Sequence, residues 1–334
     1  MRKLLHFMVN CGIMNKAIRY TIYQKETAMN IEIERLNIGV QEDPSGYIES
    51  CNLIYQDRIT EIAQKIAENR QQRPIILLAG PSGSGKTTTA LTIGKTLSDM
   101  GVITHTLSMD NYFCSLKPDE KILAAQGKID LETPRRINAE LLNEHLEAIG
   151  KCQPIELPRY DFRESESVPS GTVFRRKEGE IVIFEGIHAL NPSVIKLPDD
   201  KLSNIYVSVR TRVTCGNIVL HPSKIRLMRR MVRDRNFRSR TLYETLNMFK
   251  SVEEGENKYI TPYKYRSNFD VDTFIPYELN AYCHELRDDL MQMTDKPELD
   301  DLRAILGSLR PLSPSLITPD SLICEFFGGG QFMY

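Results

Sequence analysis

The octapeptide Gly80-Pro81-Ser82-Gly83-Ser84-Gly85-Lys86-Thr87 fits the pattern GxxxxGK[ST], and no other feature of the sequence restricts the fold so strongly. The apolar run Pro74 to Ala79 precedes it, and a stretch of helical character from Thr87 to Met100 follows. Glycines let the backbone wrap closely around an anion, so that amide N–H groups and the N-terminus of the next helix point at phosphate oxygens. The pattern therefore predicts a strand, a phosphate-binding loop and a helix that together bind ATP and Mg²⁺.

Residue types along the loop suggest individual roles. We expect Lys86 to reach the β- and γ-phosphates and the Thr87 hydroxyl to bind Mg²⁺. The residues predicted to bind the nucleotide along this loop are Gly80, Ser82, Gly83, Ser84, Gly85, Lys86, Thr87 and Thr88. A glycine-rich turn with a surface lysine is the alternative, and it leaves the flanking strand and helix patterns without a reason.

Short apolar runs and helical patterns alternate beyond the loop. Three runs are typical of buried strands, namely Thr104 to Met109, Ile181 to Phe184 and Ile205 to Val209. Helical patterns fall between them, at about 137–149 and 223–234. This alternation predicts an α/β domain of the P-loop NTPase type, with a mostly parallel sheet and helices on both faces.

The chain is expected to divide into three parts. Residues 1–50 lack sustained periodicity and are predicted to be a leader or extension. Residues 51–277 would form the phosphate-binding domain, with a mobile arginine-rich lid at about 223–250. Renewed helical periodicity, followed by prolines and a glycine-rich tail, predicts a C-terminal helical cap over residues 278–334.

The overall charge balance favours no polyanionic partner. With 43 basic and 44 acidic side chains, we expect neither nucleic acid nor a membrane surface as the default partner. The seven cysteines lie singly, as is usual in a reducing compartment, and no apolar run is long enough to span a membrane. The first residues look faintly like a secretion signal, but His6 and Asn10 interrupt the apolar stretch. We predict a cytoplasmic protein and leave open whether it forms homo-oligomers.

Two acidic residues directly follow predicted strands. Asp110 comes after the strand that ends at Met109, and Glu185 comes after the one that ends at Phe184. Ligands of open α/β sheets bind outside the carboxyl ends of the strands, so both side chains can meet the phosphate loop. A kinase acting on an alcohol needs one carboxylate to accept the hydroxyl proton and another to orient the hydrated metal. Asp110 and Glu185 are candidates for these two roles.

An arginine cluster is the third feature, and its members are Arg226, Arg229, Arg230, Arg233, Arg235, Arg238 and Arg240. Arginines on a mobile lid can stabilise charge on a transferred phosphoryl group. A solvated helix face or a nucleic-acid contact surface is the alternative. Arg226, Arg230 and Arg233 share one helical stripe, and Arg238 and Arg240 would lie beyond it on a loop able to close.

From about Ile75 to Phe274 the chain resembles the uridine kinase branch of the uridine kinase and phosphoribulokinase family. Besides the phosphate loop, the motifs that carry the resemblance are Met109-Asp110-Asn111-Tyr112-Phe113, Asp130-Leu131-Glu132, Leu157-Pro158-Arg159-Tyr160-Asp161-Phe162, Phe184-Glu185-Gly186-Ile187 and Arg226 to Asp234 with Arg238 and Arg240. The tail is similar to that of bacterial uridine-kinase-like proteins with an N-terminal region like that of threonyl-tRNA synthetase. That region is largely absent here.

The resemblance implies a small-molecule nucleoside acceptor and a role for each matched residue. Asp110 would be the catalytic base for the nucleoside 5′-hydroxyl, with Lys86 and Arg233 as further catalytic residues. Arg233, Arg238 and Arg240 match lid arginines that contact the ATP phosphates or the acceptor, and Glu185, with Thr87, would lie at Mg²⁺. The residues implied at the acceptor are Glu132 and Arg230 near the ribose, and Phe113 and Tyr160 lining the base pocket.

Two positions depart from the family pattern. Ser165 stands where uridine kinases have a histidine, and Met248 stands where a glutamine helps to read the pyrimidine. Buried polar groups that hydrogen-bond a substrate give strong discrimination, so the base preference is open. We expect an ATP-dependent nucleoside kinase. The alternatives are a kinase for another small alcohol, such as a sugar phosphate or pantothenate, and a non-catalytic nucleotide-sensing or RNA-binding protein.

Overall fold

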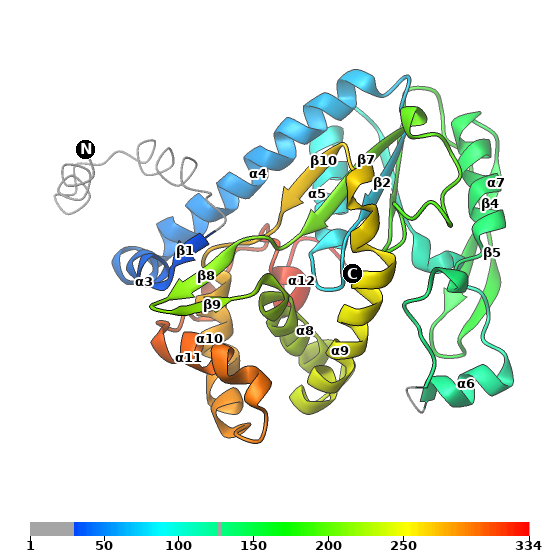
Figure 1. Cartoon of the computed structure of the whole chain (residues 1–334). Helices are drawn as coiled ribbons and strands as arrows, with labels where there is room; N and C mark the ends of the chain where they lie inside the picture. The colour runs from blue at the N-terminus through cyan, green and yellow to red at the C-terminus, as the bar shows by residue number, and fades with distance from the viewer. Residues whose placement is uncertain (1–29, 126–127, 334) are drawn as a thin grey trace. The chain divides into compact units, whose positions relative to one another are not determined.

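The computed structural model describes residues 30–125 and 128–333, in which helices and strands alternate along the chain (Figure 1). The helices are α3 (Ile33–Glu42), α4 (Pro44–Asn69), α5 (Lys86–Asp99), α6 (Pro118–Ala125), α7 (Ala139–Gly150), α8 (Pro222–Arg238), α9 (Leu242–Tyr259), α10 (Glu278–Gln292), α11 (Asp300–Ser308) and α12 (Cys324–Phe327). The strands are β1 (Asn30–Glu32), β2 (Ile75–Ala79), β3 (Thr104–Ser108), β4 (Ile155–Asp161), β5 (Glu166–Phe174), β6 (Ile181–Glu185), β7 (Leu202–Ser208), β8 (Arg212–Cys215), β9 (Ile218–Leu220) and β10 (Phe269–Asp272).

The chain forms two compact units. Among the described residues, the larger unit comprises those within 58–209, 226–273 and 322–333, and the smaller comprises 30–57, 210–225 and 274–321. The predicted division into 1–50, 51–277 and 278–334 stays a prediction, and residues 1–29 lie outside the described residues.

The larger unit is built on a five-stranded sheet with the order β10-β7-β2-β6-β3. Every pairing in it is parallel, and the register sets Leu78 and Ser108 on either side of Glu185. The carboxyl ends of β2, β3 and β6 therefore meet at one edge. The predicted α/β fold with a mostly parallel sheet is confirmed, and the predicted strand at 205–209 begins earlier, at Leu202.

Helices cover both faces of this sheet, and the three central strands β2, β6 and β7 are buried along their whole length. Val182 and Phe184 of β6 pack in one apolar cluster with Leu142 and Leu146 of α7. Ile183 points to the opposite face, since successive side chains of a strand alternate, and it lies against α5 near Gly94. The sheet thus places the N-terminus of α5 at the edge where Glu185 ends β6.

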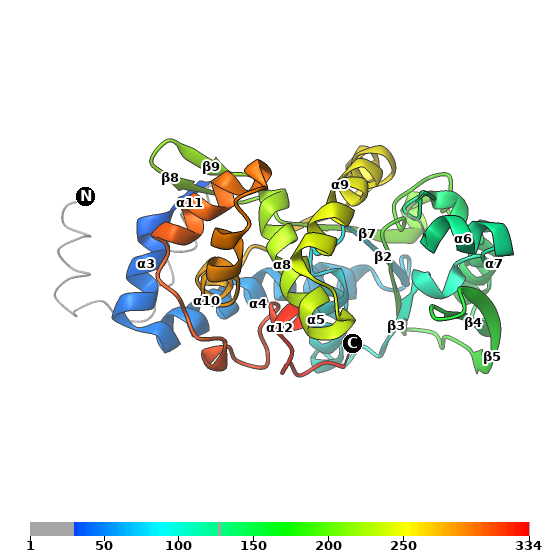
Figure 2. The same ribbon diagram turned by 90° about the horizontal axis from the view of Figure 1, so that it is seen from below.

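A hairpin and a helical turn complete the larger unit beside the sheet. Strands β4 and β5 pair antiparallel, and the short 3-10 helix Met109–Tyr112 follows β3 directly. Packing of β4 against this 3-10 helix brings the hairpin next to Asp110 and Phe113. Figure 2 shows the hairpin beside α6 and α7.

The smaller unit has its own sheet and core. Strands β1, β8 and β9 form a mixed sheet, and α10 packs against α11. The buried Tyr277 hydroxyl donates to Asn52 Oδ1 at 2.8 Å and lies 2.6 Å from the Ser321 hydroxyl, which ties both ends of the segment 274–321 to α4. Among the helices of the described residues, none is long and apolar enough to cross a membrane.

Candidate active site

The glycines of the loop between β2 and α5 adopt backbone conformations that other residues avoid. Gly83 and Gly85 have φ of 73° and 81°, in the left-handed region that favours glycine. A Cβ on Gly80 would lie 2.0 Å from the Val207 carbonyl oxygen, so the loop could not pass β7 with a larger residue. Gly85 is the N-cap of α5, so the loop leads directly into the N-terminus of a helix, where the first amide groups have no partner within the helix.

Three arginines of α8 donate hydrogen bonds to this loop. Arg226 Nη1 donates to the Ser82 carbonyl at 2.9 Å, and Arg229 Nη1 donates to the Gly83 carbonyl at 3.1 Å. Arg230 Nη1 donates to the Ser82 hydroxyl. Arg229 is fully buried and also donates to the Thr273 carbonyl at 2.7 Å, so it is a structural residue of the phosphate loop. The sequence pattern did not distinguish this role from that of a lid arginine.

Two carboxyl groups lie at the edge of the sheet. The Ser108 hydroxyl donates to Glu185 Oε1 at 3.1 Å and accepts from the Asp110 amide at 3.3 Å, linking the ends of β3 and β6. Burial raises the pKa of Glu185 to about 7, against the opposing charge of Lys86. Burial likewise raises the pKa of Asp110, which Lys86 and Arg238 partly offset. The structure thus brings Asp110, Glu185 and Lys86 within electrostatic reach of one another, and their catalytic roles stay predictions.

Glu132 lies in a second group of titratable side chains. Burial and the charge of Glu256 raise the pKa of Glu132 to about 7, while Arg230 and Lys86 act in the opposite direction. The Tyr259 hydroxyl donates to Asp130 Oδ2 at 2.9 Å in the same loop. Glu132 and Arg230, the two residues assigned to the acceptor sugar, therefore lie within electrostatic reach of each other and of Lys86.

The lid arginines converge on Asp234 of α8, which is fully buried. Arg233 Nε lies 3.3 Å from its carboxylate, Arg238 Nη1 lies 3.2 Å away and Arg240 Nη1 lies 3.6 Å away. The connection after α8 is turned back by Ser239, whose φ is 52°. One buried carboxylate thus gathers the three arginines predicted to serve the phosphates and offsets one of their three positive charges.

Replacing Asp234 with Asn should lower the free energy of unfolding by about 2 to 3 kcal/mol, because three cations lose the buried charge that pairs them. Urea unfolding of the wild type and the variant measures the difference. Asp288→Asn is the matched control, since Asp288 is exposed and pairs with Arg287 at 3.4 Å, and a change below about 0.5 kcal/mol is expected there. Equal losses in both variants would contradict the gathering role of Asp234.

Aromatic side chains cluster between the 3-10 helix and the β4–β5 hairpin. The Phe113 and Tyr160 rings pack edge to face with centroids 5.5 Å apart, and Arg136 Nη2 donates to the Tyr160 hydroxyl at 3.0 Å. Ser165 lies in the hairpin turn with φ of 55°, and Met248 is half-exposed on α9. Phe113 and Tyr160 are thus neighbours, and their role in binding a base stays a prediction.

Sequence reasoning missed several residues of this site. Ser82 N–H donates to Glu256 Oε1 at 2.7 Å, and Thr88 N–H donates to Glu325 Oε2 at 3.1 Å. His188 is fully buried near the backbone of Glu132, and burial lowers the pKa of its imidazole to about 4. Only Asp234 carried a signal in the sequence, as a single acid among arginines. The others reach the site through tertiary contacts that no local pattern encodes.

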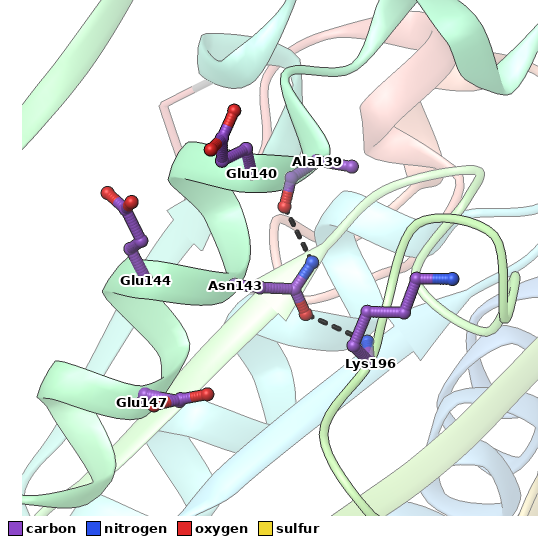
Figure 3. Close-up of a pocket in the computed structure, with 6 residues that line it drawn as sticks. All are labelled: Ala139, Glu140, Asn143, Glu144, Glu147 and Lys196. Atoms are coloured by element: carbon purple, nitrogen blue, oxygen red, sulfur yellow. Dashed lines mark hydrogen bonds between the residues drawn. The ribbon is translucent and has the colours of Figure 1, made fainter.

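An open pocket beside α7 lies apart from these residues. It is lined by Ala139, Glu140, Asn143, Glu144, Glu147 and Lys196 (Figure 3). Asn143 Nδ2 donates to the Ala139 carbonyl at 2.6 Å, and its Oδ1 accepts from the Lys196 amide at 2.8 Å. The amide of Asn143 thus joins the helix to the segment after β6, and the pocket shares no residue with the phosphate loop.

The donor set at the sheet edge fits a magnesium–nucleotide complex. Gly83 and Gly85 turn the loop around the N-terminus of α5, Lys86 acts electrostatically on two carboxyl groups, and Thr87 is half-buried in the first turn of α5. Mg²⁺ is commonly held through one or two carboxylates together with substrate phosphates. Assignment of Thr87 and Glu185 to the metal stays a prediction.

Comparison with known proteins identifies related sequences and structures. A model of the Phosphoribulokinase / Uridine kinase family matches residues 75–275. A uridine kinase of Lactobacillus helveticus is 31% identical over 198 residues, which are 58% of this chain and 83% of that protein. A uridine kinase of Schizosaccharomyces pombe is 31% identical over 186 residues, which are 55% of this chain and only 35% of that protein. D-glycerate 3-kinase from Cryptococcus neoformans var. grubii aligns with a TM-score of 0.43 and 13% identity, covering 62% of this chain and 88% of that one.

Proposed function

Since the chain belongs to the phosphoribulokinase / uridine kinase family, we propose that it transfers the γ-phosphoryl group of ATP to the 5′-hydroxyl of a nucleoside. The observation that carries the proposal is the pair of carboxyl groups at the sheet edge, the half-buried Asp110 and the buried Glu185, whose pKa values are raised beside Lys86 at the phosphate loop. A site that only binds nucleotide has no use for a proton acceptor there. The proposal does not extend to residues outside the family match.

Asp110 is the general base in this proposal. Burial raises the pKa of Asp110, which makes its carboxylate a better proton acceptor, and the charges of Lys86 and Arg238 oppose this rise. Lys86 and the loop amides hold the phosphates, and Arg233, Arg238 and Arg240 stabilise the charge on the transferred group. Magnesium, when bound, neutralises charge on the β- and γ-phosphates, and Thr87 and Glu185 would hold it.

The acceptor is held on the side of Glu132 and Arg230. A carboxylate and a guanidinium together can hydrogen-bond vicinal hydroxyls such as those of a ribose. The edge-to-face rings of Phe113 and Tyr160 offer an aromatic surface for a base. Uridine is therefore the first acceptor to test, and the names of the relatives support the same choice.

An acceptor panel tests the proposal directly. ADP release would be followed with ATP, Mg²⁺ and one acceptor at a time, using uridine, cytidine, adenosine, a sugar phosphate and pantothenate. We expect a pyrimidine nucleoside to raise the rate of ADP release at least about a hundredfold over the acceptor-free rate. If a non-nucleoside alone stimulated the reaction, the nucleoside assignment would fail and the kinase assignment would stand.

A kinase for another small alcohol is the second candidate. Ser165 and Met248 favour it, because they replace the two polar side chains that read the base in uridine kinases.

An RNA-binding role has less support. Arg226 and Arg229 are buried and donate to carbonyls of the phosphate loop, and Asp234 offsets one of the three charges of the lid arginines, so the basic surface is weaker than the sequence suggested. A cytoplasmic location and the oligomeric state stay predictions.

A further inference from the structure

The C-terminal segment 322–327 returns to the phosphate loop, although it lies outside the residues 75–275 that match the family. Its helix α12 lies beside α5 and α8 in both ribbon views (Figures 1 and 2). The Phe326 side chain is fully buried, and Cζ of the Arg229 guanidinium lies over its ring, 5.2 Å from the ring centroid. A Cβ on Gly85 would lie 3.1 Å from the Leu322 side chain. The segment is thus packed against the loop on both sides of Glu325.

Glu325 is the residue that this packing presents to α5. Its Oε2 accepts from the Thr88 N–H at 3.1 Å and from the Thr88 hydroxyl at 2.6 Å. Thr88 belongs to the first turn of α5, whose amide groups have no partner within the helix and attract anions. These amides are the ones that a polyphosphate needs at a loop of this kind. Glu325 therefore uses donors that the nucleotide would use.

The charge of Glu325 acts on the same site. Together with Asp110 it raises the pKa of Glu185, so its carboxylate lies within electrostatic reach of the sheet edge. Glu256, which accepts from Ser82 N–H at the other end of the loop, is paired with Arg226 at 2.8 Å and is buried. Glu325 has no such cation among the residues that the structure describes. The negative charge of Glu325 is therefore less compensated by nearby cations than that of Glu256.

We propose that Glu325 is a residue of the nucleotide site, where its carboxylate competes with a phosphate group of ATP for the Thr88 amide and hydroxyl. Bound polyphosphate displaces the carboxylate, so the affinity for ATP is lower than the loop alone would give. Residues outside the family domain thereby set the nucleotide affinity. The inference rests on the proposed function only in taking the loop as the ATP site, and it is independent of the acceptor.

Glu325→Gln tests the competition, because the amide keeps the size and one hydrogen-bond acceptor but loses the charge. Dissociation constants for ATP and for inorganic tripolyphosphate would be measured by titration calorimetry on the full chain, without acceptor. We expect both ligands to bind about tenfold more tightly, since a charged hydrogen bond is roughly twice as strong as a neutral one. Glu178→Gln removes the same charge from an exposed position in the same unit and should stay within about twofold of the wild type.

Unchanged or weaker binding of both ligands by Glu325→Gln would overturn the inference. A gain for ATP alone would also overturn it, because the carboxylate would then act on the nucleoside part. Glu325→Asp keeps the charge but has a shorter side chain, so it should increase the affinity for both ligands by less than the glutamine variant does. This variant tests the competition if Glu325→Gln does not fold. These binding constants are measured without acceptor, so they can be interpreted even if no acceptor in the panel stimulates turnover. The two proposals can therefore fail separately.

Discussion

Replacing Asp110 with Asn is expected to lower turnover by at least about a hundredfold while ATP binding stays nearly unchanged. The amide has the same size but cannot accept the proton of the acceptor hydroxyl, whereas the phosphate donors of the loop are untouched. Steady-state rates with the best acceptor, together with the dissociation constant for ATP, measure the two effects. Asp119→Asn, an exposed change on α6, is the control and should keep full turnover.

The pH profile separates a proton acceptor from a merely structural carboxylate. Burial raises the pKa of Asp110 above its usual range, so the wild-type rate should fall as the pH drops and the carboxylate takes up its proton. The residual rate of Asp110→Asn should lose the part of this dependence that Asp110 causes. Turnover equal to that of the wild type would remove Asp110 from the role of base.

Glu185→Gln should abolish most turnover and at the same time stabilise the ligand-free protein at alkaline pH. The pKa of Glu185 is raised from 4.5 to about 7, so the folded state binds its proton more tightly than the unfolded state does. Folding is therefore penalised as the pH rises from 4.5 to 7, and the penalty reaches about 3 kcal/mol above that range. The neutral amide escapes this penalty.

Urea unfolding at pH 8 and pH 5 measures the second effect. We expect the glutamine variant to be more stable by about 3 kcal/mol at pH 8 and by about 1 kcal/mol or less at pH 5. Glu178→Gln should show no such pH-dependent gain, since Glu178 is exposed. A glutamine variant that is less stable than the wild type at pH 8 would mean that the ionised carboxylate supports the fold.

Four of the five strands of the parallel sheet and the helices α5 and α7 between them could be predicted because they are encoded locally. The apolar run before Gly80 became β2, and the residues after it became α5, since side-chain periodicity and glycine content act within a few residues. Asp110 and Glu185 could be placed at one edge because parallel strands must end on the same side. The density of arginines in the sequence identified the lid residues, but it did not predict that three of them pair with Asp234.

The sequence by itself determined the phosphate loop, the parallel sheet and the two carboxyl groups at its edge, because each depends on short-range pattern and one topological rule. Only the tertiary structure decided which arginines hold the loop and which side chains occupy its amides. Glu325 lies 237 positions from Thr88, and Glu256 lies 174 positions from Ser82. Such contacts arise when α8, α9 and α12 pack around the loop, and no periodicity in the chain specifies that packing.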